Sequence, residues 1–263
     1  MEAGKKTALT PVLQIENYSI TFEQYDGGWK KRTLTAVKNL NLTVAGGEVV
    51  AVVGASGSGK SLLTHGILGI LPYNASMQGC LRYQGEELTP KRIQCLRGNE
   101  IVLIPQSTSF LDPLMKVGKQ ICQGSRDSAV KEKMRRLLKE YHLEESVAEK
   151  YPFELSGGMT RRILLIMARM GEPQLVIADE PTPGLHKELA ALALGHLREL
   201  ADQGAGVLLI THDLEQALVI ADRLVVFYEG ETIEEVRAED FRQEETLRHS
   251  YTKALWRASK MLV

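Results

Sequence analysis

The sequence predicts an α/β fold, and two observations carry this prediction. Short apolar runs rich in Val, Ile and Leu alternate with longer segments in which apolar residues recur at helical spacing. A glycine-rich loop also joins one such run directly to a helical segment. Strands that alternate with helices favour a parallel sheet covered by helices. A chain of 263 residues is long enough for one such core with an inserted subdomain.

The predicted elements follow one another along the chain. Strands are expected at residues 12–22, 39–44, in the run ending at 53, and at 101–106, 174–180, 206–213 and 223–231. Helices are expected at residues 61–71, 129–145, 161–170 and 187–203. Residues 23–32 are rich in turn formers and are expected to form a loop between the first two strands. From about residue 107 to 170 the sequence is mainly of helical character, which predicts a helical insertion.

Composition and charge exclude several classes of protein. The net charge is −1, so no basic excess indicates a nucleic-acid partner. The three cysteines, Cys80, Cys95 and Cys122, lack metal-binding spacing and indicate reduced thiols. We expect no secretion signal, and no run approaches the about 18 apolar residues that span a bilayer. If the protein works at a membrane, other chains must span it.

The glycine-rich loop fits the pattern G-x-x-x-x-G-K-[ST] between a strand and a helix, which is the context that a phosphate-binding loop requires. Glycines let the backbone approach phosphates closely, and its N–H groups point inward at a helix N-terminus. Lys60 is expected to reach the β- and γ-phosphates, and the Ser61 hydroxyl to coordinate Mg²⁺. The predicted ATP-binding residues of this loop are Gly54, Ser56, Gly57, Ser58, Gly59, Lys60, Ser61 and Leu62.

Two adjacent acids follow the apolar run Leu175–Ile177. Asp179 ends this predicted strand, in the position from which a carboxylate contacts the magnesium ion of a bound nucleotide. Glu180 comes one residue later, where it can polarise the attacking water. The alternative is that both are surface acids at the end of a strand.

A second glycine-rich stretch, Leu-Ser-Gly-Gly-Met at residues 155–159, precedes a predicted helix. Ser156, Gly157 and Gly158 offer a hydroxyl, exposed backbone N–H groups and a helix dipole, which together suit an anion. Alone, the stretch is equally typical of a helix N-cap followed by flexible glycines.

Taken together, the phosphate-binding loop, the two acids and residues 155–159 resemble the motifs of ABC-transporter nucleotide-binding subunits, in which the last stretch is called the signature. The resemblance covers about residues 12–255, with the motifs in family order. It implies a P-loop NTPase (RecA-like) core with an N-terminal antiparallel β subdomain and an inserted α-helical subdomain. The implied division is residues 1–106 and 171–240 for the ATP-binding core, 107–170 for the helical signature subdomain and 241–263 for a C-terminal tail.

The resemblance implies further site residues. Gln106 matches the Q-loop, which senses Mg²⁺ and water and connects to the transmembrane partner, and His212 matches the switch histidine that contacts the γ-phosphate. Asp213 is a candidate to orient His212. The aromatic residue that stacks on adenine is expected in the first loop, where Tyr25 and Trp29 are both candidates. The implied catalytic residues are Glu180, His212, Gln106 and Lys60, and the implied Mg²⁺ ligands are Ser61, Gln106 and Asp179.

The family also implies partners and location. Its ATPases work as head-to-tail dimers in which two ATP molecules are held between the loop of one subunit and the signature of the other. Ser156, Gly157 and Gly158 are therefore expected to contact the ATP bound by a partner. The implied complex contains two transmembrane permease subunits, a second and non-identical ATPase and, indirectly, a solute-binding protein, with no nucleic acid. The chain is expected to be peripheral, on the cytoplasmic face of the bacterial inner membrane.

Within the family, residues 105–121 and 248–257 resemble the branch that imports oligopeptides, dipeptides and nickel, with Ser250 where proline is usual. Peptide-importing members usually continue into a longer, cysteine-containing extension, so the short format favours a nickel-import subunit, with a di- or oligopeptide importer as the alternative. A soluble ABC ATPase without a transport role, or a regulatory nucleotide-binding subunit, is the alternative from a different class.

One position departs from the family pattern. The segment called the D-loop usually reads S/T-A-L-D, and its aspartate helps to couple the two sites of the dimer. Here the sequence is Thr182-Pro183-Gly184-Leu185-His186, so histidine stands at the aspartate position. Histidine supplies no fixed negative charge. The departure leads to the hypothesis that the two sites of a heterodimer are unequal, the alternative being that His186 packs harmlessly at the interface.

Overall fold

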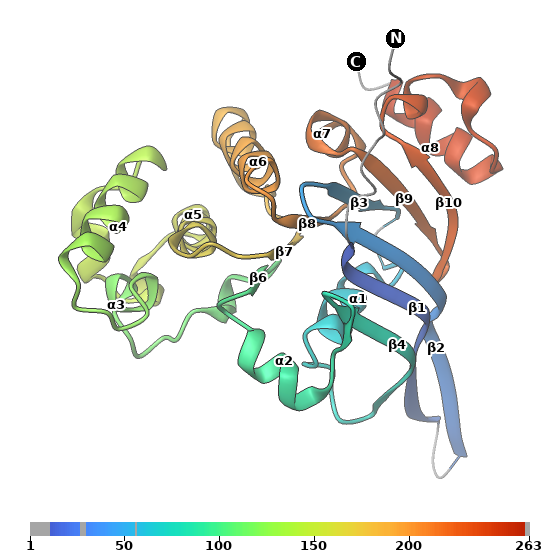
Figure 1. Cartoon of the computed structure of the whole chain (residues 1–263), viewed down its shortest axis with the longest axis horizontal. Coiled ribbons are helices and arrows are strands. Elements are labelled where there is room, and N and C mark those ends of the chain that lie inside the picture. Colours follow the sequence, from blue (N-terminus) through green and yellow to red (C-terminus); the bar gives the residue numbers. More distant parts are fainter. Residues whose placement is uncertain (1–10, 27–29, 56, 261–263) are drawn as a thin grey trace.

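The computed structural model describes residues 11–26, 30–55 and 57–260, which form two sheets and the helices around them (Figure 1). The larger sheet has the spatial order β10 (Glu231–Arg237), β9 (Arg223–Tyr228), β3 (Val49–Val53), β8 (Gly206–Thr211), β7 (Leu175–Asp179) and β6 (Ile101–Ile104). All its pairings are parallel except that of β9 with β10. The smaller sheet is antiparallel, in the order β2 (Lys30–Ala45), β1 (Pro11–Asp26), β4 (Ala75–Tyr83) and β5 (Glu86–Glu87).

The helices of the described residues are α1 (Lys60–Ile67), α2 (Pro90–Leu96), α3 (Val117–Ile121), α4 (Ser128–Glu140), α5 (Gly157–Met170), α6 (Lys187–Asp202), α7 (Leu214–Ile220) and α8 (Ser250–Lys260). Helix α1 packs on one face of the larger sheet, and α5, α6 and α7 pack on the other. Short 3₁₀ turns occur at Thr108–Phe110, Glu145–Glu149, Pro152–Glu154, Asp240–Arg242 and Glu244–Thr246. No helix of the described residues is long and apolar enough to cross a membrane.

The central strands divide the core into two layers because successive side chains on a strand point to opposite faces. On β7, for example, Val176 joins one hydrophobic cluster with α5, α6 and α7, whereas Ile177 joins a second cluster with α1 and the smaller sheet. These strands are fully buried, so they appear in the sequence as continuous apolar runs. Helix α1 consequently packs between the two sheets, directly after the phosphate-binding loop.

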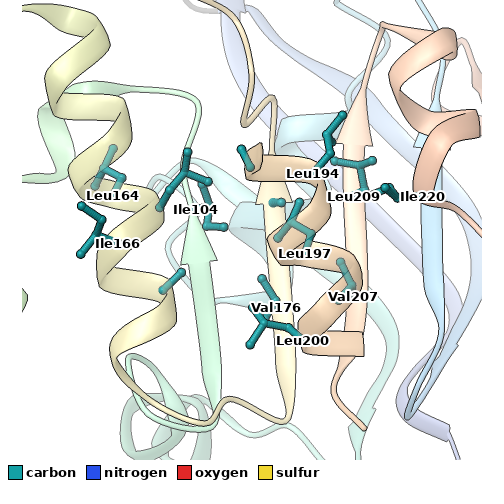
Figure 2. Close-up of a cluster of buried hydrophobic side chains, with 14 of the residues drawn as sticks. Ile104, Leu164, Ile166, Val176, Leu194, Leu197, Leu200, Val207, Leu209 and Ile220 are labelled. Atoms are coloured by element: carbon teal, nitrogen blue, oxygen red, sulfur yellow. The ribbon is translucent and has the colours of Figure 1, made fainter. Parts of the chain in front are cut away.

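The first layer is held by apolar stripes on two helices. Figure 2 shows Leu194, Leu197 and Leu200 along one side of α6, next to Val176 of β7 and Val207 of β8. Their spacing of three residues places them on one face of the helix. Helix α5 extends the same cluster beyond the edge strand β6 (Figure 2). The carboxyl ends of β3, β7 and β8, where the candidate site lies, therefore rest on a rigid support.

The loop predicted at residues 23–32 was wrong in extent, because β1 and β2 continue as a long hairpin on either side of residues 27–29. Glu23 pairs in register with Thr33, and the Glu23 carboxylate accepts a 2.9 Å bond from the Lys31 ammonium. The described side chains of this extension are largely exposed. A strand that is polar on both faces lacks the alternation from which half-buried strands are predicted. Strand β4, which is also largely exposed, was not predicted for the same reason.

The helical insertion appears between β6 and β7, where residues 105–174 are all described and contain only helices and turns. The helix predicted at 129–145 ends earlier, at Glu140, because the chain turns through a left-handed His142 (φ 54°). The helix predicted at 161–170 starts earlier, since α5 begins at Gly157. In Figure 1, α3, α4 and α5 lie to one side of the larger sheet.

A polar network centred on a buried histidine connects this helical part to α6. The imidazole of His196 lies 2.6 Å from the Tyr141 hydroxyl through Nδ1 and 2.7 Å from the Glu140 carboxylate through Nε2. Arg169 of α5 binds the carboxylates of both Glu140 and Glu199. Burial, followed by the nearby Arg169 charge, lowers the pKa of His196 below its ordinary 6.5 even though the two carboxylates oppose this. The network joins α4, α5 and α6 through one ring.

We predict that His196→Gln reduces the free energy of unfolding at pH 7.5 by about 1–3 kcal/mol, since Tyr141 and Glu140 lose a buried partner. The unfolded chain takes up the His196 proton near pH 6.5, and the folded chain does so only at lower pH. Wild-type stability therefore falls as pH drops below 6.5, and the fall is smaller in the variant. Urea unfolding from pH 7.5 to 5.5 measures both effects. His142→Asn, at an exposed position, is the control, and equal pH dependence in His196→Gln and wild type would contradict the assignment.

Candidate functional site

The phosphate-binding loop connects β3 to α1 and packs tightly against its neighbours. A Cβ atom at Gly54 would lie 2.0 Å from the carbonyl oxygen of Phe227, so no side chain fits there. Gly59 has φ 101°, and a Cβ atom on it would lie 2.7 Å from the carbonyl oxygen of Ala36. Only glycine satisfies both the conformation and the close approach. The loop is thus fixed by backbone contacts with β9 and β2, and its backbone can approach a phosphate group.

Lys60 lies at the start of α1 with its ammonium group across the loop. Its Nζ donates to the carbonyl oxygens of Gly54 at 2.9 Å and Ala55 at 2.8 Å. Burial lowers the pKa of Lys60, whereas the negative charges of Glu180 and Asp179 act in the opposite direction. A buried ammonium beside two acids and a glycine loop is suited to binding an anion of high charge.

The first acid, Asp179, ends β7 and contacts the loop directly. Its Oδ1 accepts a 3.2 Å hydrogen bond from the Ser61 hydroxyl. Only 3% of Asp179 is exposed, and this burial raises the pKa of its carboxyl group while the Ser61 bond lowers it. Ser61 and Asp179 thus bring two oxygen ligands together, which is the donor type that Mg²⁺ prefers.

The second acid, Glu180, has an unusual backbone with φ 49°, in the left-handed region. A residue other than glycine adopts this conformation at an energetic cost, so the surrounding structure must hold it. Its N–H donates to the Ile210 carbonyl at 2.9 Å. Its Oε1 lies 2.7 Å from the Nδ1 of His212 and accepts the His212 backbone N–H at 3.0 Å. Glu180 and His212 therefore act as one unit.

Lys60, Ser61 and Glu180 line a common pocket of about 250 Å³, together with Gly57, Gly59, Leu62 and Gln106. Parallel pairing of β3, β7 and β8 brings their carboxyl ends to this one place. The pocket lining thus supplies an ammonium, a hydroxyl, an amide and the Glu180 carboxylate beside two glycines. Asp179 and the exposed His212 join these groups through their contacts with Ser61 and Glu180. That combination suits the phosphates of a nucleotide and a water molecule beside them.

Comparison with known proteins agrees with this geometry. Residues 37–183 match the family profile described as ABC transporter. The chain belongs to the ABC transporter family. A putative peptide import ATP-binding protein of Brucella abortus (strain 2308) is 33% identical over 269 residues, covering 97% of this chain and 78% of the relative. The oligopeptide transport ATP-binding protein of Bacillus subtilis (strain 168) is 33% identical over 262 residues, covering 94% of this chain and 71% of the relative.

Solved structures of ABC transporter cassettes share the fold. One neighbour, described as a dimeric bacterial ABC transporter cassette, has a TM-score of 0.73 and 25% identity, covering 86% of this chain and 98% of the neighbour. Another, with a TM-score of 0.72 and 25% identity, is a post-hydrolysis state of an ATP-binding cassette bound to ADP and Pi, with the same coverage of both chains. The predicted fold class is therefore confirmed, and the chain is an ABC ATPase.

The signature lies apart from this pocket. Ser156 is the N-cap of α5, and its Oγ accepts a 3.3 Å bond from the Met159 N–H. Ser156 and Gly157 are exposed, and neither is among the residues that line the pocket of the same chain. Gly158 lies against the segment that carries His186, since its Cβ position is 3.5 Å from the Gly184 carbonyl. In this ABC ATPase, the signature and that segment share one surface.

The D-loop segment, residues 182–186, is a tight turn. The Leu185 N–H donates to the Thr182 carbonyl at 3.0 Å, and Gly184 has φ 80°. Proline and glycine at the two central positions are typical of a type II turn. His186 follows as the N-cap of α6, is exposed and makes no capping bond through its side chain.

The structure also revises some expected roles. Asp213 was a candidate to orient His212, but its carboxylate caps α7 by accepting the Gln216 N–H at 3.0 Å, and His212 is held by Glu180 instead. Ser56 and Trp29 lie outside the described residues, as does the side chain of Tyr25. Neither adenine candidate is therefore placed.

Two residues near the site were missed by sequence reasoning. Arg161 of α5 is buried, and its guanidinium binds the backbone carbonyls of Glu180 and Gln106. Tyr251 of α8 accepts the Ala55 N–H at 3.2 Å, so the tail reaches the phosphate-binding loop. Residues 248–257 were noted only as a marker of the branch. Both contacts involve backbone atoms, which leave no pattern in the sequence.

Proposed function

We propose that this chain is the ATP-hydrolysing subunit of a bacterial importer of di- or oligopeptides. The observation that carries the proposal is that Lys60, Ser61 and Glu180 line one pocket, with Asp179 bonded to Ser61 and His212 in contact with Glu180. The cargo rests on the relatives, which are named for peptide import or oligopeptide transport and cover most of this chain. Their names favour the peptide alternative over nickel, for which the comparisons offer no support.

The residues present fit ATP and Mg²⁺. The glycines leave the backbone accessible, as the open Cβ position of Gly57 illustrates. Lys60 would bind the β- and γ-phosphates, while Ser61, Asp179 and Gln106 would hold the metal ion. Bound Mg²⁺ would supply positive charge that offsets the negative charge developing during phosphoryl transfer. The described residues contain no group of three or more His, Cys, Asp or Glu able to hold a metal, so the nucleotide would complete the coordination.

Glu180 is proposed as the general base. Its Oε1 accepts the His212 backbone N–H and lies 2.7 Å from the Nδ1 of the same residue, which leaves Oε2 with one long contact of 3.4 Å to the Thr211 hydroxyl. This oxygen can accept a proton from water at the pocket. His212 has 58% of its side chain exposed, so a phosphate group can reach its Nε2. An imidazolium donates from both ring nitrogens, and in that form His212 would bind Glu180 through Nδ1 and the developing charge on the γ-phosphate through Nε2.

A head-to-tail dimer follows from the proposal. Ser156, Gly157 and Gly158 would contact the ATP held by a partner, which is supported by their place at the N-terminus of a helix of 14 residues and by the exposure of Ser156 and Gly157. The complex would contain two permeases and a second ATPase, with a solute-binding protein acting indirectly. The chain would lie on the cytoplasmic face of the inner membrane as a peripheral subunit.

We further propose that the second ATPase is non-identical and that the two sites are unequal. His186 occupies the place of the usual aspartate, and its exposed side chain is free of a capping role. Its neighbour Gly184 lies against Gly158 of the signature. The site that receives this D-loop would lack one fixed negative charge, and it would hydrolyse ATP more slowly than the other site.

The catalytic assignment predicts that Glu180→Gln lowers ATP hydrolysis by about 100-fold or more while ATP still binds, because the amide cannot take a proton. Phosphate release and equilibrium binding of ATP, measured on the assembled complex purified through a tag on this chain, report the two effects. Glu188→Gln, an exposed change in the first turn of α6, is the control. Hydrolysis at the wild-type rate in Glu180→Gln would show that another group is the base.

The cargo assignment predicts that cells lacking this chain lose uptake of labelled di- and oligopeptides and retain uptake of radioactive nickel. The wild-type chain restores peptide uptake, and Glu180→Gln does not. Purification through a tag on this chain should recover permeases and a second ATPase. Loss of nickel uptake with peptide uptake intact would show that the cargo is nickel and not peptides.

The asymmetry proposal predicts that His186→Asp raises ATP hydrolysis by the assembled complex, up to about twofold if one active site becomes two. His142→Asp, an exposed change within the helical part, serves as the control. Steady-state hydrolysis and transport are measured on the same preparation. Rates unchanged from wild type in both assays would remove the basis for unequal sites.

A further inference from the structure

Arg161 connects three segments that belong to different parts of the site. It lies in α5, five residues after the signature serine Ser156, and only 9% of it is exposed. One terminal nitrogen of its guanidinium donates to the Glu180 carbonyl at 2.5 Å. The other donates to the Gln106 carbonyl at 2.7 Å. A single side chain thus links the signature helix, the Q-loop and the end of β7.

A hydrogen bond to the Glu180 carbonyl oxygen affects how the backbone of Glu180 is held. Glu180 has φ 49°, a conformation that costs free energy and persists only where the surroundings hold it. The Ile210 carbonyl fixes its N–H, and His212 fixes its carboxylate. Arg161 supplies the remaining restraint, on the carbonyl oxygen. The direction in which the Glu180 side chain points therefore depends on the position of α5.

Arginine suits this role better than other cations. Its planar guanidinium presents donors in a fixed fork, so two carbonyls can be bound at once in a set geometry. Lysine has one flexible ammonium and no such fork. The positive charge is also near Glu180 and Asp179, and both carboxylates favour the charged form of Arg161 against the effect of burial. The contact is therefore both a geometric and an electrostatic link.

We propose that Arg161 is a positioning residue that couples the signature of this chain to the carboxylate of its own ATP site. The inference rests on the proposed function, in which the signature contacts the ATP of a partner and Glu180 is the general base. A helix moves as a rigid unit, so a shift of Ser156 against that ATP displaces Arg161 with it. The displacement moves the Glu180 and Gln106 carbonyls together. Contact of the signature with the ATP at one site thus sets the position of the general base at the other site.

The test compares Arg161→Gln with Arg169→Gln, measured on the intact transporter purified through a tag on this chain. Arg169 lies on the same helix and binds Glu140 and Glu199, away from the ATP pocket. We expect Arg161→Gln to lower the kcat of ATP hydrolysis about tenfold with the KM for ATP within about twofold, because Lys60 and Ser61 keep their contacts. Arg169→Gln should lower the melting temperature and leave both kinetic constants near wild type.

Arg161→Lys provides the conservative variant. Its ammonium keeps the charge and reaches one of the two carbonyls, so we expect recovery of part of the lost kcat. Should Arg161→Gln fail to fold, Arg161→Lys must still have a kcat at least about twofold below wild type at unchanged KM. A wild-type kcat in Arg161→Lys would then overturn the proposal.

A double-mutant cycle with Ser156→Ala tests the coupling itself. If Arg161 transmits the signature contact to Glu180, Ser156→Ala lowers kcat less in the Arg161→Gln background than in wild type. Independent effects, with the two losses in kcat multiplying, would overturn the coupling. So would an Arg161→Gln enzyme with the kinetics of Arg169→Gln. Failure of the proposed function is distinguishable, since wild type would then hydrolyse no ATP or Glu180→Gln would remain active.

Discussion

The parallel pairing of β3, β8 and β7 is the constraint on which the site depends. Val53 pairs with Thr211, and Asp179 pairs with Ile210, so the three strands end at the same level. Each strand is followed at once by a functional residue or loop. The phosphate-binding loop, Glu180 and His212 are consequently adjacent in space although more than 150 residues separate the first from the last. A slip in the register of any of these strands would separate the groups that follow them.

Charge balance explains how so many ionisable groups share one buried place. Lys60, Arg161, Asp179 and Glu180 are each less than one tenth exposed. Burial disfavours the charged forms of Lys60, Arg161 and Asp179, and the opposite charges nearby reduce that effect for Lys60 and Arg161. Two cations and two anions thus keep the cluster near neutrality. An added nucleotide changes this balance strongly, which makes the cluster sensitive to what the pocket binds.

Residue identity predicted one part of the site, and backbone geometry determined the rest. The loop around Lys60 and the acids at 179 and 180 were predicted because glycines, a lysine and strand-end acids are needed there by chemistry. The contacts of Arg161 were not, because backbone carbonyls occur at every position and the partners are 19 and 55 residues away. The long hairpin was missed because its exposed side chains carry no apolar alternation. The α/β class followed from short apolar runs that alternate with helical segments, since parallel strands buried on both faces appear as continuous apolar runs.

The turn at Thr182–Leu185 has a consequence for the free energy of dimer closure. Pro183 restricts the backbone even in the unfolded chain, and the hydrogen bond between Leu185 and Thr182 fixes the turn in the folded one. A loop that is ordered before its partner arrives loses little conformational entropy on association. In the proposed dimer, the free energy of ATP binding would then go into contacts across the interface and not into ordering this segment. The loop would accordingly be about equally ordered in the closed dimer and in the reopened one.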